Sequence, residues 1–568
     1  MILRRCQIHA IVVVASVVSL AFPGVVWADG EPWAVSTFNC IGLYWSPRDG
    51  APENLCGVRY RPTGVVEWKQ ALPLWFDARG AEELPVEHRR QYRGSLVHLT
   101  AGTLYEIELS LQRTGRQSLL YVQTWDEHFP IGETVMVSDS LKPLVVDRSG
   151  SPQGYILYTH PPDLETATID VRNEHAQCVE IRGSHVILRG LTLRNAREHG
   201  IQIFQGCHDV VIESCDVSDW GRIEDDGWGH EQDSAIYSAE ADVKRVIVQR
   251  NLIHRPRGDS NTWKEWRGPG PGEGSYHPVG PQAMCFRDSE GNHVIRYNTI
   301  WSDDDHQYND ILGGSSNHSA RGFPNRDSDI YGNLLSHCWD DAIESEGANC
   351  NVRIWGNYST ESFTSIACAS TLIGPLYVWR NICGEIRIAP NEGSGAFLKT
   401  SDKMGGGRVF VFHNTIWQPL RTTGKGEITV GAEQGFGGDP MLNVTSRNNI
   451  LHARSVAIRD RTADPAGDYD YDLYTGEFRA PDRHETHGVQ GEPVYVNGYG
   501  MTGNQGLFWL SSASPGYDGG VPLPNFNDGY EGRAPDIGAH EADTPLMEFG
   551  VEAYPEDLSV RVENRVEN

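Results

Sequence analysis

Positive charge is scarce in this sequence. Its 568 residues contain 48 Lys and Arg against 76 Asp and Glu, which gives a formal net charge of −28 at pH 7. Nucleic-acid binding needs a basic surface, so this balance argues against a nucleic acid as the partner. The 11 cysteines include no Cys-x-x-Cys pair and no zinc-type spacing, which argues against a zinc site.

Long apolar runs are missing after the first 28 residues. Arg4 and Arg5 precede an apolar run over residues 8–22, and small residues stand before a cleavage point after Ala28. The run is short for a bilayer-spanning helix, so it predicts a secretory signal peptide over residues 1–28 rather than a membrane anchor. We therefore expect a protein that is secreted, periplasmic or displayed at the cell surface, with no membrane span in the mature chain.

Short alternating strands separated by turns occupy residues 29–126, and they predict a small β-sandwich. The stretch from Leu99 to Tyr105 resembles the fibronectin type III pattern, in which a Leu precedes a tight turn and a Tyr hydroxyl bonds back to the backbone. Cys40 and Cys56 lie in this domain and are predicted to form a disulfide in an oxidising compartment. The other eight cysteines of the mature chain are expected to be buried thiols.

From residue 170 onward, segments of alternating apolar residues recur that end in Asn, and two earlier segments fit with Leu or Cys at the Asn place. The closing residues are Leu191, Cys215, Asn251, Asn298, Asn333, Asn357, Asn381, Asn414 and Asn448. A spacing of 24 recurs as the minimum, with longer steps elsewhere, which indicates a coil of fixed minimum length that carries loop insertions. Asn tolerates left-handed backbone angles and hydrogen-bonds its neighbours, so we interpret these residues as structural.

This ladder, together with the closing stretch 535–541, resembles the pectin-lyase-like superfamily of right-handed parallel β-helices. The resemblance implies an all-β chain, in which residues 127–541 form the solenoid after the sandwich. Residues 542–568 are expected to form an acidic C-terminal tail. It also implies an exported protein that acts on carbohydrate polymers.

A second register locates a group of carboxylates. Six coils carry a small residue followed by an apolar one, except that Ile311 stands at the small position of one pair. The residues before these pairs form a column that runs His199, Ser234, Gln282, Asp310, Asp341 and Thr364. Asp310 and Asp341 thus lie on adjacent coils, with Asp340 beside them, and strand alternation turns Glu344 away from the core. Closely stacked carboxylates repel one another, so they are expected to share a proton, bind a metal or perform acid–base work.

Residues 340–343 resemble the Asp-Asp-Cys-Val/Ile stretch of polygalacturonase-type glycoside hydrolases, and residues 309–312 match their Asn-Thr-Asp stretch one coil earlier. The resemblance implies hydrolysis with inversion, with Asp340 as the acid and Asp310 and Asp341 as the water-activating pair. Glu344, which strand alternation places beside them, is a further candidate catalytic residue. The His of the family's Gly-His-Gly is missing at residues 364–366, and the Lys of its Arg-Ile-Lys is missing at 387–389. The arrangement of the aspartates is therefore the part of the resemblance that remains.

Two other functions stay open. The same acidic residues suit calcium, with Asp304, Asp305, Asp310, Asp341 and Glu346 as possible ligands, and calcium with a base would make the protein a polysaccharide lyase or epimerase. A non-catalytic glycan-binding surface protein is the third alternative. The hydrolase requires no cofactor.

The insertion around residues 251–298 looks like substrate-binding material. It is locally basic, against the trend of the chain, and it contains interleaved aromatic residues. Aromatic faces stack on sugars, and Arg matches carboxylate or sulfate geometry, so an anionic polysaccharide is the expected partner. The residues assigned to substrate binding are Trp263, Trp266, Arg255, Lys264, His306 and Lys399.

Overall fold

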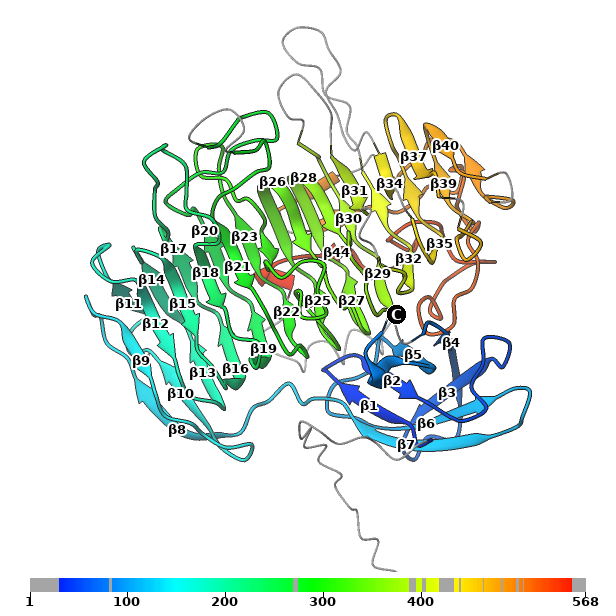
Figure 1. The fold of residues 1–568 in the computed structure, drawn as a ribbon, viewed down its shortest axis with the longest axis horizontal. Coiled ribbons are helices and arrows are strands. Elements are labelled where there is room, and N and C mark those ends of the chain that lie inside the picture. The colour runs from blue at the N-terminus through cyan, green and yellow to red at the C-terminus, as the bar shows by residue number, and fades with distance from the viewer. Residues whose placement is uncertain are drawn as a thin grey trace, which may run out of the picture.

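The computed structural model describes residues 30–80, 84–268, 274–387, 395–400, 405–417, 434–438, 441–462, 464–481, 484–496, 500–503 and 505–553. The predicted signal peptide and the end of the predicted acidic tail lie outside the described residues. Almost all of the regular secondary structure in the described residues is β-strand, so the predicted all-β class is confirmed (Figure 1). No helix in the described part of the chain is long and apolar enough to cross a membrane.

Seven antiparallel strands form the N-terminal sandwich, in the order β1-β2-β5-β4-β3-β6-β7. The strands are β1 Trp33–Ser36, β2 Ile41–Trp45, β3 Cys56–Pro62, β4 Lys69–Asp77, β5 Gln91–Leu96, β6 Leu104–Leu111 and β7 Gln117–Gln123, with one 3-10 turn at Val86–His88. Alternate side chains of β6 are buried, as expected for a strand with one covered face. Tyr105 Oη accepts a hydrogen bond from the Thr100 N–H at 2.9 Å, which is the link expected at this turn. The fibronectin type III assignment itself stays a prediction.

The predicted disulfide is wrong, because Cys40 and Cys56 are both free thiols. Cys56 lies inside the sandwich core, whereas Cys40 packs between Val97 and the β-helix residue Trp379. Both cysteines therefore act as small apolar side chains in two different clusters. The prediction for the other eight cysteines is confirmed, since all of them are buried.

A parallel β-helix follows the sandwich, as the sequence predicts, and its strands stack in three columns. The first column is a 12-stranded sheet, which comprises β8 Ile131–Met136, β10 Tyr155–Thr159, β13 Val186–Arg189, β16 His208–Glu213, β19 Lys244–Gln249, β22 Val294–Arg296, β25 Asp329–Tyr331, β27 Val352–Trp355, β29 Leu376–Trp379, β32 Val409–Phe412, β35 Val444–Arg447 and β38 Asp468–Asp470. Each strand pairs in parallel with the next coil, which is the arrangement of a solenoid.

The second and third columns share two long strands, so they form one 22-stranded sheet. The β11–β41 column comprises β11 Ala167–Asp170, β14 Leu191–Arg194, β17 Asp216–Ser218, β20 Leu252–His254, β23 Thr299–Trp301, β26 Leu334–Glu344, β28 Tyr358–Ala367, β30 Ile382–Cys383, β33 Thr415–Ile416, β36 Ile450–Leu451, β39 Leu473–Tyr474 and β41 Val489–Gln490. The β9–β40 column comprises β9 Leu144–Val146, β12 Gln177–Ile181, β15 His199–Ile203, β18 Ser234–Ser238, β21 Gln282–Phe286, β24 Leu312–Gly313, the ends of β26 and β28, β31 Ala396–Lys399, β34 Gln434–Gly438, β37 Val456–Asp460 and β40 Glu477–Arg479.

The asparagine ladder is present and structural, with one change of register. Asn251 Nδ2 donates to Asn298 Oδ1 at 3.0 Å, and the same contact repeats from coil to coil up to Asn414. The next member is Asn449, not the predicted Asn448. The left-handed backbone angle belongs to the residue before each ladder Asn, such as Arg250 at φ 56°, and Asn448 occupies that position at φ 59°.

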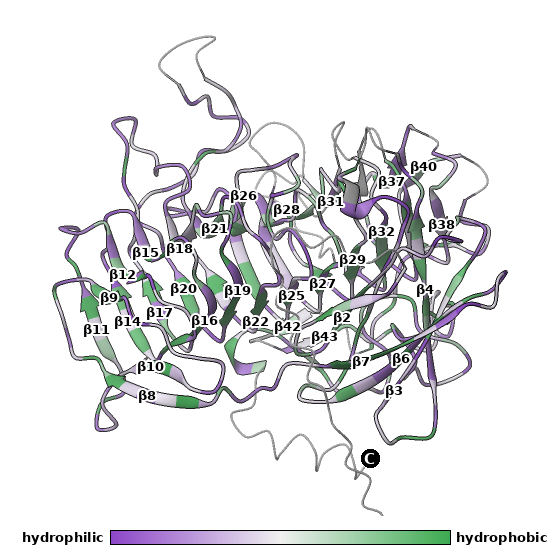
Figure 2. Cartoon of the chain, turned by 60° about the horizontal axis from the view of Figure 1, so that its bottom comes forward, coloured by the Kyte–Doolittle hydropathy of each residue, from purple (hydrophilic) through white to green (hydrophobic). Residues whose placement is uncertain are grey.

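The core of the β-helix is a continuous stack of apolar side chains, and it confirms the second register predicted from the sequence. Hydrophobic residues, green in Figure 2, recur along the stacked strands. In the β9–β40 column, the stacked residues pair in the order Ile201, Ile236, Met284, Leu312, Ile343, Ile366 and Leu398. The residues two positions earlier pair as well, for example Asp341 with Thr364. Asp310 and Asp341, two positions before Leu312 and Ile343, thus lie on neighbouring coils, and the Asp341 N–H donates to Asp310 Oδ1.

The sandwich covers the outer face of the 12-stranded sheet, next to β25, β27 and β29 (Figure 1). Polar contacts join the two domains: Tyr44 Oη donates to Asp327 at 2.8 Å, and Thr37 donates to Asp329. Asp329 also forms a buried ion pair of 2.6 Å with Arg353. The contacts of Thr37 and Tyr44 thus hold the sandwich against the solenoid.

The C-terminal segment covers the β11–β41 column. It contains a small antiparallel sheet of β42 Gly500–Thr502, β43 Gln505–Leu507 and β44 Met547–Glu548, followed by a 3-10 turn at Val551–Ala553. Phe549 is 1 % exposed and packs against Tyr358 of β28 at 5.5 Å between ring centroids. Residues 542–553, expected in the acidic tail, thus pack on the solenoid. The inserted loop meets the β9–β40 column, where His277 Nε2 lies 3.3 Å from an oxygen of Asp340.

Candidate active site

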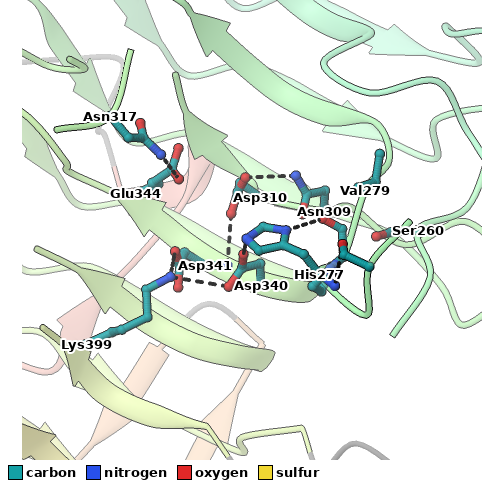
Figure 3. A network of polar contacts seen from close by, with 12 residues as sticks. Ser260, His277, Val279, Asn309, Asp310, Asn317, Asp340, Asp341, Glu344 and Lys399 are labelled. Carbon is teal, nitrogen blue, oxygen red and sulfur yellow. Dashed lines mark hydrogen bonds and ion pairs between the residues drawn. The ribbon is translucent and has the colours of Figure 1, made fainter. Parts of the chain in front are cut away.

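Three carboxylates from two neighbouring coils converge on the face of the β9–β40 column (Figure 3). One oxygen each of Asp310, Asp341 and Glu344 lies within 4.8 Å of the other two, and all three side chains are buried. The register explains the convergence, because Leu312 pairs with Ile343 and the residues two positions earlier lie side by side. Accordingly, the backbone N–H of Asp341 donates to Asp310 Oδ1 at 3.1 Å.

Glu344 points outward because its neighbour Ile343 belongs to the stacked core. Two donors hold its carboxylate: the Gly314 N–H donates to Oε2 at 3.2 Å, and Asn317 Nδ2 donates to Oε1 at 2.6 Å. Gly313 leaves the space that this carboxylate occupies, since a Cβ at that position would lie 2.8 Å from Glu344 Oε2. The absence of a side chain at Gly313 therefore allows Glu344 to take this position.

Asp310 is oriented by the coil before it and by its own neighbour. Gln282 Nε2 and Asn309 Nδ2 both donate to Asp310 Oδ2, at 2.9 and 3.0 Å. Together with the Asp341 N–H on Oδ1, these donors fix both oxygens of the carboxylate. The side chain thus has one orientation before any ligand binds.

Lys399 reaches the carboxylates from two coils further along the solenoid. Its neighbour in β28 is Ala367, whose methyl group lets the long side chain lie across it. Lys399 Nζ donates to Asp341 Oδ2 at 2.5 Å, and it lies 3.4 Å from Asp340 Oδ1 and 3.9 Å from Glu346 Oε1. Burial lowers the pKa of Lys399, but the surrounding carboxylates raise it more, so the net pKa is well above its usual range.

Ionising all of these carboxylates at once is energetically unfavourable. Burial first, and then the charges of its acidic neighbours, raises the pKa of Asp310 well above its usual range, and the same causes raise the pKa of Asp341. Burial and the charge of Glu346 raise the pKa of Glu344 to about 8. Lys399 opposes all three shifts but does not cancel them. The site therefore favours either a shared proton or a bound cation.

The donor set fits a calcium ion. Calcium binds carboxylate oxygens at about 2.3–2.6 Å, so two of its ligands lie at most about 5 Å apart. The oxygens of Asp310, Asp341 and Glu344 satisfy this limit, with all three pairs within 4.8 Å. Asp341 Oδ1 is also buried and has no hydrogen-bond partner among the described residues, as expected of an oxygen that awaits a cation.

Asp340 lies at the edge of this group and meets the inserted loop. Its side chain is buried, with Oδ1 facing Lys399 and Oδ2 lying 3.3 Å from His277 Nε2. Trp263 packs against His277 at 4.8 Å between ring centroids and against Phe363 at 5.9 Å. The insertion is thus anchored to the site through His277 and Trp263.

The other predicted binding residues lie around this centre. Trp266 is 38 % exposed and makes an edge-to-face contact with Tyr276 at 5.2 Å, while Lys264 and Arg255 are exposed. His306 Nδ1 lies 2.8 Å from an oxygen of Asp303, and this pair is half-exposed. Trp266, Lys264 and Arg255 therefore lie on the surface of the inserted region, and His306 lies shortly after it.

The suggested calcium ligands divide into two sets. Asp304 is exposed and pairs with Arg387 at 2.8 Å, and Asp305 is also exposed. Neither belongs to the group of three oxygens that lie within 4.8 Å of one another, whereas Asp310 and Asp341 do. Glu346 reaches the site through Lys399.

Sequence reasoning missed the residues that support the carboxylates. The sequence gives no signal for Asn317, which lies in an irregular loop and meets Glu344 only through the fold. Gly313 and Ala367 could have been found, because small residues beside charged positions of a register indicate space for neighbouring side chains. Ile388 and Ala389, which occupy the place of the family's Ile-Lys, lie outside the described residues.

No family model and no curated protein matches this chain. The chain is similar to the crystal structure of pectate lyase Pel9A, with a TM-score of 0.38 and 12 % identity over 72 % of this chain and 86 % of that one. It is also similar to two structures of the catalytic domain of a GH87 alpha-1,3-glucanase in complex with nigerose. Each has a TM-score of 0.37, with 8 and 9 % identity over 82 % of this chain and 91 % of that one. These TM-scores and identities are too low to assign a function to this chain.

Proposed function

We propose that this protein is an exported polysaccharide lyase that cleaves a uronate-containing polymer by cation-assisted β-elimination, with Lys399 as the base. The observation that carries the proposal is the contact of Lys399 Nζ with Asp341, inside a group of three convergent buried carboxylates. A uronate carries an acidic C–H beside its carboxylate, and removing that proton requires a base and a counter-charge. The candidate site contains both elements.

Lys399 has the role of proton acceptor. Its amine takes the proton from the carbon that bears the uronate carboxylate, the glycosidic C–O bond on the next carbon breaks, and a double bond forms between the two carbons. The leaving oxygen takes a proton from solvent, so the products are one unsaturated and one saturated end. Asp340 and Asp341 hold the amine in place from two sides.

Asp310, Asp341 and Glu344 would hold the calcium ion. When bound, calcium offsets the negative charge that raises the pKa of Lys399 and binds the carboxylate of the substrate. The hydrogen bonds from Gln282, Gly314 and Asn317 keep the ligand oxygens aimed at one point. The inserted loop around Trp266 then offers aromatic surface for sugar rings.

A glycoside hydrolase is the second candidate, since the raised pKa values of Asp310 and Glu344 suit a carboxyl group that donates a proton. The close packing of the carboxylates favours it less. Three carboxylate oxygens lie within 4.8 Å of one another, which suits a bound cation. Asp340, the acid of the predicted hydrolase, lies outside this group of three.

The test uses the mature protein on a panel of polyuronates and neutral glucans, with and without a calcium chelator. We expect ultraviolet absorbance to rise on a polyuronate, as unsaturated ends form, and chelation to abolish the rise until Ca²⁺ is restored. Reducing sugar without an ultraviolet change, formed in the presence of chelator, would favour the hydrolase. Polymer binding without any cleavage on the panel would leave a glycan-binding protein.

Lys399→Arg tests the role of the base. Arginine keeps the positive charge beside Asp341 but stays protonated, so it cannot accept the proton. We expect a folded variant whose kcat falls by about 10²–10⁴. Lys142→Arg, at an exposed position far from the site, is the matched control. An active Lys399→Arg variant would remove Lys399 from the chemistry while leaving the calcium site open to test.

A further inference from the structure

A second cluster of metal-binding side chains lies on the 12-stranded sheet, on a different column from the carboxylates. It consists of His185, His208 and Asp209, each of which offers one ligand atom within 4.8 Å of the other two. His208 Nδ1 lies 2.7 Å from Asp209 Oδ2, and His185 Nε2 lies 3.7 Å from the same oxygen. The proposed lyase chemistry uses none of these residues.

The fold brings these residues together from two adjacent coils. Val186 of β13 pairs with Val210 of β16, so the residues just before them, His185 and Asp209, lie one above the other. Both have left-handed backbone angles, with φ 53° and 54°, at the same bend of successive coils. His208 precedes Asp209 in β16 and therefore joins the pair at this edge.

The carboxylate of Asp209 is held so that one oxygen stays with the two histidines. Arg245 pairs with Asp209 Oδ1 at 2.7 Å, and Tyr155 Oη donates to the same oxygen at 3.4 Å. Outer partners of this kind orient a metal ligand and are typical of metal sites.

The distances match a tetrahedral site. Zinc binds imidazole nitrogen and carboxylate oxygen at about 2.0–2.2 Å, which places the ligands of a tetrahedron about 3.3 Å apart. The two measured separations, 2.7 and 3.7 Å, lie on either side of this value, so movements of about half an ångström in each side chain accommodate the ion. Two imidazoles and one carboxylate favour Zn²⁺ or a similar transition metal over calcium.

We propose that His185, His208 and Asp209 bind one Zn²⁺-type transition-metal ion, which clips two coils of the solenoid together where the chain enters it. The site lies beside the segment that leads out of the sandwich. Trp125 of that segment contacts Arg245, with 5.2 Å from the guanidinium to the ring centroid, and Phe129 packs against Tyr155 at 5.3 Å. The metal therefore stabilises the junction of the two domains and takes no part in cleavage.

The experiment is a Zn²⁺ titration of the untagged, metal-stripped mature protein by calorimetry, with Co²⁺ absorption as a report on tetrahedral geometry. We expect one Zn²⁺ equivalent whose Kd weakens at least tenfold in His185→Ala and in His208→Ala. His128→Ala is the matched control, because His128 also faces an aspartate, Asp126, at 3.5 Å but has no second histidine in the cluster. Zn²⁺ should raise the Tm of the wild type and of the control.

Asp341→Asn separates this site from the carboxylate site. If Zn²⁺ binding is lost in Asp341→Asn and kept in His208→Ala, or if the wild type binds no Zn²⁺, the proposal is overturned. A Zn²⁺ equivalent that persists in Asp341→Asn and disappears in both histidine variants supports it. Loss of lyase activity in Asp341→Asn bears on the proposed function alone, so the two proposals fail separately.

Discussion

Replacing Gly313 with alanine tests whether the exact position of the Glu344 carboxylate matters. Gly313 does not have a positive φ, so alanine can adopt the same backbone conformation at this position. The new Cβ would lie 2.8 Å from Glu344 Oε2, about 0.6 Å short of the 3.4 Å at which ordinary van der Waals contact begins. The carboxylate must therefore move, against the hydrogen bonds from Gly314 and Asn317.

The expected effect follows from the narrow range of calcium distances. Calcium–oxygen bonds vary over only about 0.3 Å, so a shift of 0.6 Å removes Glu344 as a good ligand. A misplacement of about 1 Å can cost a hundredfold in rate, so we expect Gly313→Ala to weaken Ca²⁺ binding and to lower kcat/KM by about ten- to a hundredfold. The rest of the solenoid should be unaffected.

Calorimetry with Ca²⁺ and initial rates on the best polyuronate measure the two quantities. Gly529→Ala is the matched control, because its Cβ would meet nothing within 4 Å. Unchanged Ca²⁺ affinity and rate in Gly313→Ala, at the wild-type Tm, would refute the role of Glu344 as a ligand. A variant with a strongly lowered Tm would instead show that Gly313 serves packing.

Three further predictions follow from the same structure. Asn357→Ala removes the acceptor of the Asn333 backbone and side-chain N–H groups, so urea denaturation should show a loss of at least about 2 kcal/mol; an unchanged midpoint would contradict the ladder's role. Glu344 has a pKa of about 8 in the fold, so between pH 4.5 and 8 the folded chain holds a proton that the unfolded chain has released. The protonated carboxyl therefore stabilises the fold fully below pH 4.5, and this stabilisation is lost as the pH rises through 8. In calcium-free buffer, the free energy of unfolding should fall less steeply with pH in Glu344→Gln than in the wild type. An identical slope in the two proteins would exclude Glu344 as the group that titrates. Trp266→Ala should weaken polymer binding roughly fivefold without lowering the Tm, since the ring is partly exposed and an aromatic contact is worth about 1 kcal/mol; binding at wild-type strength would remove it from the binding surface.

The sequence was sufficient for the solenoid because its signals are repetitive. Each coil must place apolar residues in the core and a bend at the same corner. The repeat can therefore be recognised even if one residue is assigned to the wrong position. The error at Asn448 shows the limit of this reading. Two consecutive asparagines fit the same corner, and only the hydrogen bond from Asn414 to Asn449 Oδ1 identifies the second as the ladder residue.

The disulfide prediction failed for the opposite reason. Cys40 and Cys56 are close in sequence and lie in one domain, but their side chains point into different clusters. One packs inside the sandwich, and the other packs against the face that the sandwich presents to the solenoid. A pairing of two cysteines depends on directions in space, which spacing along the chain does not supply.

The candidate site was likewise predictable from the sequence only in part. The sequence alone placed Asp310 and Asp341 on adjacent coils, because the register of a parallel β-helix is set by the periodic core residues beside them. Only the tertiary structure brought Lys399 to Asp341 across 58 positions of the chain, and placed Asn317 and Gly313 against Glu344. These contacts depend on loop paths and on the free space above small residues. The local sequence pattern determines on which face of a strand a side chain lies. Which distant side chain contacts it on that face depends on the packing of the whole fold.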